Sequence, residues 1–287
     1  MKHTEESVFD RVNQSLKTSV SIKLLSIGVL IAILLIPNSM IKSLIVERQS
    51  NQYAAVKEIS DSWASPVELS GPILTIPYET LVETKNDERR VKHYAHFLPN
   101  LLSIDGDLTP KIRKRGIYEV VVYNTQMEFH GNFEKPTFDN FEYSPEKILW
   151  SEAVISIGIP DMSGIESNLI LKFSDKDYRM QPGIPSNMKL GLGQNLIQQY
   201  VEGGVRPITQ QTGVNSRVSI SSDQNSFDFK LALNLKGTKS LVLNPIGKTT
   251  KVTINSTWEH PSFNGRFLPD ERTITENGFK AEWSIFD

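Results

Sequence analysis

The side chains best suited to chemistry lie close together near the C-terminus, where four of them share one short segment: Trp258, Glu259, His260 and Arg266. On a strand, Trp258 and His260 would share a face, because successive side chains point to opposite faces. An aromatic ring beside an imidazole and a guanidinium is suited to a sugar that stacks on the indole, so this cluster is a candidate ligand-binding site. The alternative is a strand end and turn in which Phe263 and Phe267 enter the core and a proline fixes His260.

The other histidines do not indicate a metal site. His93 and His96 lie three positions apart, so a strand would point them to opposite faces. The chain also has no cysteine, which excludes disulfides, thiolate nucleophiles, zinc–thiolate sites and iron–sulfur clusters. We therefore expect neither a metal nor any other cofactor.

Two glycine motifs fail at single positions. Gly247–Thr249 resembles the end of a phosphate-binding loop, but that loop needs a glycine where Val242 stands. Gly191 and Gly193 would need a third glycine, where Leu196 stands, to form a dinucleotide-binding loop. The chain also lacks the G-x-S-x-G pattern of serine hydrolases. We predict no catalytic residues and no enzymatic activity.

The charges indicate which partners are excluded. The net charge is −2, from 31 Lys+Arg and 33 Asp+Glu, and this balance argues against nucleic acid, whose phosphates require a basic face. One basic cluster precedes Gly116 and contains Lys111, Arg113, Lys114 and Arg115. Most such clusters are solvated strand-edge charges that prevent edge-to-edge pairing. A cluster that faced a bilayer would instead contact anionic lipid head groups.

The elements that would position these residues begin with one predicted transmembrane helix at Leu24–Val46. The segment carries no charge from Leu24 to Ile41, and about 20 apolar residues suffice to cross the hydrocarbon core. A buried core helix would be amphipathic, whereas Leu30–Ile36 is apolar on all sides. A secretory signal would end in a small-residue cleavage site, and none follows Ile36. We therefore expect an uncleaved span.

The segments that flank the span predict its orientation. Residues 1–23 form a short polar tail with Lys17 and Lys23 close to the apolar run, and most of the chain follows the span. The positive charges and the bulk of the chain together place the tail in the cytoplasm and the large domain outside it.

Residues 47–66 predict a juxtamembrane helix. Apolar side chains recur there at helical spacing, and neither glycine nor proline interrupts them before Pro66. The segment would be either a free stalk or an amphipathic helix packed on the first strands of the domain. The second interpretation is favoured because Val56, Ile59 and Trp63 need a cover.

From Gly71 onward the apolar period changes from helical to two, which is typical of strands. Pro72–Val82 and Arg89–Leu98 predict a hairpin. Further strands are expected at Gly116–Phe133, Glu152–Ile159, Asn168–Phe173, Arg217–Ser221, Phe227–Leu235, Ser240–Leu243, Thr250–Trp258 and Gly278–Ile285. The one helix expected in this region is Gln194–Tyr200. Residues 67–287 therefore predict a mainly β domain, an antiparallel β-sandwich of two sheets packed face to face.

A short internal repeat, here called the internal echo, leaves open whether the sandwich is duplicated. Phe129–Phe133 and Phe263–Phe267 both carry a central glycine between two phenylalanines, and each follows a β-branched strand pattern. Duplication of one half of the sandwich would produce these two segments. They would equally arise from the common need for glycine where a strand bends between core aromatics.

Several motifs together resemble the CreD family of bacterial inner membrane proteins. In chain order they are Leu35-Ile-Pro37, Ile45-Val-Glu47-Arg48, Ser70-Gly-Pro72-Ile-Leu-Thr-Ile-Pro77, Phe97-Leu-Pro99, Arg115-Gly-Ile-Tyr118, Trp258-Glu-His260-Pro-Ser-Phe263-Asn-Gly265-Arg-Phe267-Leu-Pro269 and Gly278-Phe279-Lys-Ala-Glu-Trp283. No single motif is specific, but their order and their spread over nearly the whole chain are. The resemblance implies an inner membrane protein with one N-terminal span, a large periplasmic domain and C-terminal spans, linked to colicin tolerance and cell-envelope integrity.

This chain stops at Asp287, where the family would continue into its C-terminal membrane helices. We therefore expect a truncated, naturally split or naturally shortened member of the family. The resemblance implies a non-enzymatic function at the envelope with a protein partner. The alternatives are a sensory module that binds a glycan or envelope polymer and, less favoured, a carbohydrate-active enzyme. An enzyme or lectin needs a cleft with charged and aromatic groups, whereas a scaffold needs an exposed apolar or edge-strand surface.

Overall fold

A computed structural model describes residues 20–84, 87–139, 145–159, 161–165, 168–185, 199–201, 204–206, 212–221 and 223–286. The chain divides into two compact units, the first ending at Val56 and the second beginning at Lys57. We call the second unit the β domain. The prediction for the N-terminal tail before Val20 lies outside the described residues.

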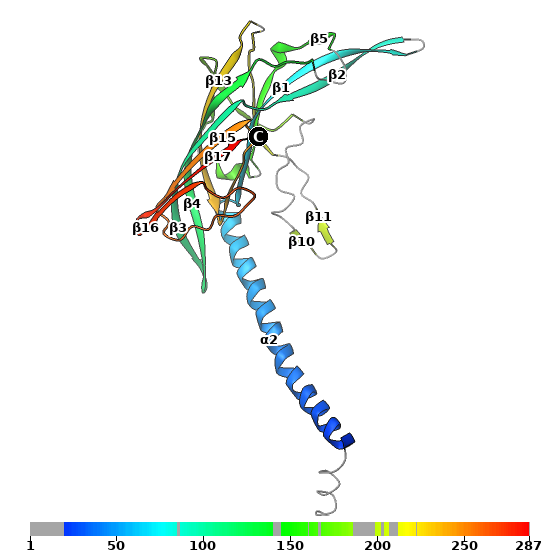
Figure 1. Cartoon of the computed structure of the whole chain (residues 1–287), viewed down its shortest axis with the longest axis vertical. Coiled ribbons are helices and arrows are strands. Elements are labelled where there is room, and N and C mark those ends of the chain that lie inside the picture. Colours follow the sequence, from blue (N-terminus) through cyan, green and yellow to red (C-terminus); the bar gives the residue numbers. More distant parts are fainter. Residues whose placement is uncertain are drawn as a thin grey trace, which may run out of the picture. The chain divides into compact units, whose positions relative to one another are not determined.

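The first unit is built on a single helix, α2 (Val20–Ser62), which continues through Pro37 (Figure 1). Its most apolar stretch has a mean hydropathy of 2.3, and none of that stretch is buried against protein. By length and composition α2 is able to cross a membrane. A helix that is apolar on all sides is typical of a membrane span or of the core of a large protein, and the exposure of this stretch agrees with the predicted span.

The smaller of the two large sheets has seven strands in the order β14-β1-β6-β12-β9, with β2 and β5 also pairing with β1. Their bounds are β1 Val67–Thr84, β2 Asp87–Phe97, β5 Lys147–Ile148, β6 Val154–Gly158, β9 Gln181–Pro182, β12 Gly213–Arg217 and β14 Leu241–Asn244. β1 and β2 form the predicted hairpin, whose register runs from Leu74 opposite Phe97 to Thr84 opposite Asp87.

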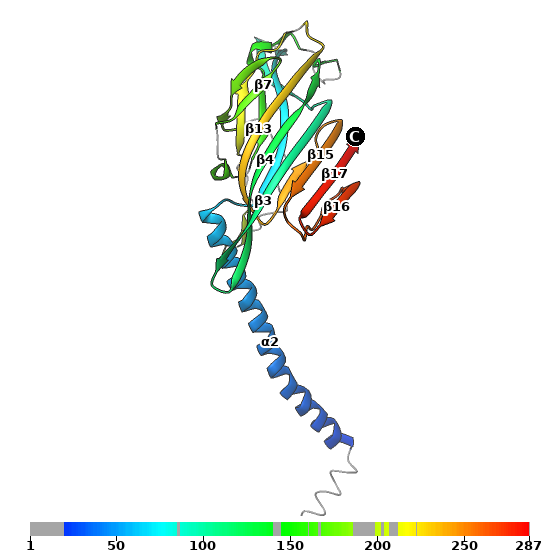
Figure 2. The same cartoon turned by 90° about the vertical axis from the view of Figure 1, so that its left-hand side faces the viewer.

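The larger sheet has eight strands in the order β16-β17-β15-β3-β4-β13-β7-β8, and Figure 2 shows β16 at one of its edges. Their bounds are β3 Leu101–Arg115, β4 Tyr118–Glu134, β7 Ile170–Phe173, β8 Lys176–Arg179, β13 Ser226–Thr238, β15 Thr249–Ser256, β16 Glu271–Thr275 and β17 Gly278–Phe286. The remaining elements are β10 Gln199–Val201, β11 Gly204–Arg206, and two 3-10 turns at Trp150–Glu152 and Met162–Gly164.

The two sheets share one hydrophobic core. Leu74, Ile76 and Ile155 enter it from the seven-stranded sheet, and Phe129 and Phe227 enter it from the eight-stranded sheet. β13 shows why the sequence folds this way, since every second residue from Phe227 is buried and the residues between are mostly exposed. The mainly β architecture that the sequence predicts is therefore confirmed.

Two strand pairs differ from the expected antiparallel pattern. β1 pairs with β14, and β3 pairs with β15, in the parallel sense. Parallel pairing requires long connections, and both pairs join strands that lie far apart in the chain. The predicted strand at Arg217–Ser221 lies earlier, at Gly213–Arg217.

The predicted helix at Gln194–Tyr200 is wrong at its last two residues, which belong to β10, and the rest lies outside the described residues. The two segments of the internal echo occupy different elements. Phe129–Phe133 lies within β4, whereas Phe263–Phe267 lies in the loop between β15 and β16. The echo therefore does not mark two equivalent strands.

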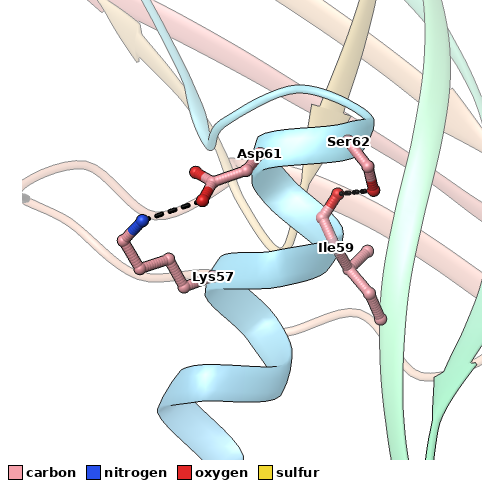
Figure 3. A network of polar contacts seen from close by, with 4 residues as sticks. All are labelled: Lys57, Ile59, Asp61 and Ser62. Atoms are coloured by element: carbon pink, nitrogen blue, oxygen red, sulfur yellow. Dashed lines mark hydrogen bonds and ion pairs between the residues drawn. The ribbon is translucent and has the colours of Figure 1, made fainter.

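The last turns of α2 belong to the β domain and pack on the eight-stranded sheet. Ile59 is buried, and Figure 3 shows its side chain pointing towards the neighbouring strands, while Lys57 pairs with Asp61 at 2.8 Å on the other side of the helix. The ring of Trp63 lies under the guanidinium of Arg113, 4.9 Å from its centroid. The Thr238 hydroxyl donates to the Ala64 carbonyl at 2.6 Å. The segment therefore packs on the domain instead of forming a free stalk, but these contacts are with β3 and β13 and not with the first strands that the sequence predicts.

Asp161 holds the segment that joins α2 to β1. Its carboxylate accepts hydrogen bonds from the backbone N–H groups of Ser65 and Ser163, both at 2.9 Å, and from the Ser163 hydroxyl at 2.6 Å. Burial alone would raise the pKa of this carboxyl, but these hydrogen bonds outweigh burial and hold the pKa below its usual value.

Asp161→Asn is expected to lower the free energy of unfolding by about 1 kcal/mol at pH 7, as loss of a capping carboxylate does. Because the folded-state pKa of Asp161 is depressed, its contribution is present at neutral pH and is lost as the pH falls through that pKa. Denaturant unfolding of the full chain should therefore show a difference between wild type and variant that shrinks in acid. The exposed Asp177 of β8 gives the matched control, Asp177→Asn. A difference that stays constant down to acidic pH would contradict this role.

Candidate functional site

The loop between β15 and β16 carries the residues that the sequence singles out as a candidate site. Trp258 is half-buried, and its indole N–H donates to the backbone carbonyl of His260 at 2.7 Å. The backbone N–H of Trp258 donates to the Ser256 hydroxyl at 3.2 Å. The polar edge of the indole is thus used to shape the loop itself.

Phe263 fixes this loop on the sheet. Its ring meets Phe279 edge-on at 5.5 Å between centroids and Trp283 at 5.8 Å, both on β17. This agrees with the interpretation in which Phe263 is a packing residue. The same interpretation is wrong for Phe267, a residue that remains 45% exposed.

The charged members of the cluster point to solvent. Glu259, His260 and Arg266 are all exposed, and the Arg266 guanidinium lies 5.7 Å from the centroid of the Phe267 ring. Within the described residues, no hydrogen bond or ion pair joins Arg266 to Trp258 or His260. The structure therefore places the three predicted ligand-binding residues on one loop, where Trp258 is half-buried and His260 and Arg266 are exposed.

The two roles of Trp258 separate by mutation. Trp258→Ala is expected to lower the free energy of unfolding by about 2 kcal/mol, because it removes a half-buried ring and a hydrogen bond. Trp258→Phe keeps a ring and should cost about 1 kcal/mol, and His260→Ala should cost less than about 0.5 kcal/mol because its side chain is exposed. Denaturant unfolding of the full chain measures all three. Equal stabilities for Trp258→Ala and wild type would contradict the structural role.

The two histidines of β2, His93 and His96, each contact a threonine of β1. His93 Nε2 lies 2.8 Å from the Thr80 hydroxyl, and its ring stacks on Tyr78 at 5.2 Å. His96 Nδ1 lies 2.9 Å from the Thr75 hydroxyl. Across the described ranges, no group of three or more His, Asp or Glu side chains is placed to hold a metal ion.

One histidine–carboxylate group was not found from the sequence. On the outer face of the eight-stranded sheet, His130 Nδ1 lies 3.7 Å from Asp105 and 3.9 Å from Glu128, and Lys230 pairs with Glu128 at 2.7 Å. Asp105 and Glu128 are paired across β3 and β4, so only the strand register reveals the group. It borders an open depression of about 550 Å³. The carboxylates lie beyond hydrogen-bond distance, so neither orients the imidazole for acid–base chemistry.

A second depression of about 420 Å³ lies where β3, β15 and the β16–β17 hairpin meet. Asp107, Asn255, Lys280 and Thr273 form one row across four strands on its floor. Asn255 donates to Asp107 at 3.1 Å. Most of its lining residues are polar, and it is open to solvent. It lies next to the loop that carries Trp258, since Thr257 forms part of it.

The edge strand β16 offers a different kind of surface. All 5 of its residues are exposed, and among the described strands it pairs only with β17. Ile274 on β16 is 47% exposed, and Phe267 and Leu268 in the loop before it are 45% and 63% exposed. We call β16 with Phe267 and Leu268 the β16 surface. A free strand edge with apolar neighbours is suited to pairing with a strand of another protein.

Comparison with known proteins agrees with the resemblance in the sequence. A family model described as "Inner membrane protein CreD" matches residues 19–287. The inner membrane protein CreD of Escherichia coli strain K12 is 29% identical over 272 residues, which cover 93% of this chain and 56% of the relative. The chain thus spans little more than half the length of the curated relative that it matches.

Proposed function

Because this chain belongs to the CreD family of inner membrane proteins, we propose that its β domain is a membrane-anchored, non-enzymatic interaction module. Its role is to maintain the integrity of the cell envelope, including tolerance to colicins. The partner is another envelope protein. One N-terminal helix able to cross the membrane supports the anchored arrangement.

The observation that carries the proposal is the β16 surface. Among the described strands its outer edge has no pairing partner, so backbone N–H and C=O groups are available there, and Ile274 and Leu268 supply exposed apolar area beside them. Glu271 and Arg272 lie on the same strand, and such charges suppress indiscriminate pairing while permitting a complementary partner.

The chemistry of the described residues supports a role without catalysis. A hydrolase or epimerase needs two carboxylates, or a histidine and a carboxylate, held in a concave pocket. The group around His130 lies on an open sheet face, and Lys230 pairs with its Glu128 at 2.7 Å. An oriented base and a water-excluding pocket are the features that a catalytic role would require.

Complementation in cells tests the proposal. In a strain that lacks this protein, the double variant Ile274→Lys/Leu268→Asp should fail to restore resistance to detergent and to colicin, because both changes disrupt the β16 surface. The control Glu259→Ala/His260→Ala alters two exposed side chains of the same loop and should restore resistance fully. Immunoblots of the membranes must show equal amounts of each variant. Full complementation by the first variant would overturn the proposal.

We also propose that the N-terminus lies in the cytoplasm and the β domain in the periplasm. The chain has no cysteine, so a single introduced cysteine reports its own location. Gln224→Cys, at an exposed turn of the β domain, should react with a membrane-impermeant maleimide in intact spheroplasts. Labelling only after the membranes are opened would reverse the orientation.

A ligand-binding function is the second candidate, and the depression lined by Asp107, Asn255 and Lys280 favours it. Peptidoglycan fragments or envelope sugars at 100 times their dissociation constant should then stabilise the domain by about 2.7 kcal/mol. A thermal-shift screen of the full chain would detect this as a rise of several degrees in Tm. The interaction module predicts no shift with any of them.

A further inference from the structure

The hairpin of β3 and β4 extends beyond its neighbours in the eight-stranded sheet. β15 pairs with β3 only as far as Leu108, and β13 pairs with β4 only from Val122 onward. β3 and β4 remain paired with each other out to Arg115 opposite Tyr118. Residues 109–121 therefore form a two-stranded ribbon that no other described strand covers. We call residues 111–119 the hairpin tip.

We propose that the hairpin tip binds the anionic lipid surface of the membrane in which the chain is anchored. The tip carries four cations and one carboxylate, namely Lys111, Arg113, Lys114, Arg115 and Glu119. Two exposed isoleucines accompany them, Ile112 with a relative accessibility of 51% and Ile117 with one of 82%. Cations bind anionic head groups, and exposed apolar side chains enter the boundary between head groups and acyl chains.

The structure ties the hairpin tip to the place where the chain enters the β domain. Arg115 forms an ion pair with Glu58 in the penultimate turns of α2, and Arg113 stacks on Trp63 at 4.9 Å. At the same end of the sheet, the backbone N–H of Val67 donates to the carbonyl of Ser240, the second residue after β13.

The tether between the span and the domain is short. Only residues 47–56 separate the apolar run that ends at Val46 from Lys57, where the domain begins. Even fully extended, such a segment reaches no more than about 36 Å. The end of the domain that carries the hairpin tip is therefore held within reach of the bilayer surface.

Protection of a free strand edge explains only part of this sequence. Charges at positions 111–115 would prevent the ribbon from pairing with another strand. Edge protection does not require an isoleucine at the turn, where Ile117 is more exposed than any other large apolar side chain of the described residues. An apolar residue between cations is instead the pattern of a segment that lies on a membrane surface.

A fluorescent probe on the tip tests the proposal. The full chain is reconstituted in vesicles, with the environment-sensitive label NBD on the single cysteine of Ile117→Cys, where the apolar label replaces the isoleucine. In vesicles that contain phosphatidylglycerol, spin-labelled lipids should quench this label strongly, and 1 M salt should weaken the quenching, because the Debye length falls to about 3 Å. In vesicles of phosphatidylcholine alone, quenching should be weak.

The far end of the same sheet gives the matched control, Gln224→Cys, which lies roughly 50 Å from the tip along β4 and β13. Its label should stay unquenched in both kinds of vesicle. Equal quenching at the two positions in anionic vesicles would overturn the proposal.

Charge substitutions give a second, independent result. Lys111→Gln/Lys114→Gln should lower the equilibrium constant for docking of the labelled tip about fivefold per lysine. Lys172→Gln/Lys176→Gln removes two exposed lysines from β7 and β8 and should leave the equilibrium constant for docking unchanged. Unaltered quenching in the first variant would show that the cations of the tip do not bind lipid.

Discussion

Replacing Gly278 by alanine is expected to lower the free energy of unfolding of the β domain by about 3–5 kcal/mol. Gly278 begins β17 with φ +126°, a conformation that side chains rarely adopt. A Cβ atom there would also collide with the carbonyl oxygen of Ser256 and lie 2.7 Å from the Cα atom of Thr257. Both obstacles are backbone, so β15 and β17 would have to separate and β16 would lose its support.

Gly265 is the matched control, because its φ is +123° and nothing lies within 4 Å of a Cβ built on it. Gly265→Ala should therefore show only the cost of backbone strain, about 1–3 kcal/mol. Denaturant unfolding of the full chain, with Tm as a second readout, compares the two. Equal losses in both variants would show that the collision with β15 is relieved at little cost.

Two arginines in the apolar run of α2 are expected to have an effect of similar size on membrane insertion. An arginine near the middle of a transmembrane helix costs about 2.5–3.5 kcal/mol in insertion, and each lost leucine adds to that cost. Leu30→Arg/Leu34→Arg should therefore move most of the chain out of the carbonate-resistant membrane fraction.

The control Ser50→Arg/Gln52→Arg adds the same charge to the same helix, beyond the apolar run. It should leave the chain in the membrane fraction. Retention of the Leu30→Arg/Leu34→Arg variant would mean that α2 is not the membrane anchor.

The elements that the sequence predicts well are those whose pattern is complete within one segment. The apolar run of α2 is continuous, and the strand β13 alternates buried apolar residues with more exposed ones along most of its length. In such segments the face that packs against the core or the lipid can be identified from the segment's own sequence, without knowing which elements pair with it.

The strands β3, β8 and β16 are not among those that the sequence predicts, and β3 shows the reason. Only its first half contacts the core, through Leu102, Ile104 and Gly106, and its second half continues as an exposed ribbon with Pro110 and several cations. The short strands β8 and β16 bury none of their residues. Strands of this kind are stabilised by pairing with neighbours distant in sequence, and composition does not reveal that pairing.

The candidate site illustrates the same limit. Sequence proximity groups Trp258, His260 and Arg266, whereas the loop directs the indole N–H to its own backbone and leaves the charged side chains in solvent. His130 and Asp105 are distant in sequence and adjacent in space. Side chains meet across strands, so register decides which of them form a group.

The central claim is that the β16 surface contacts another envelope protein, and site-specific photocrosslinking in native membranes tests it most directly. A photoreactive residue at Arg272 on β16 should give a discrete protein adduct, which Ile274→Lys should abolish. The same residue at Thr253, inside the sheet on β15, should give none. Absence of an adduct at Arg272, or the same adducts at both positions, would contradict the account.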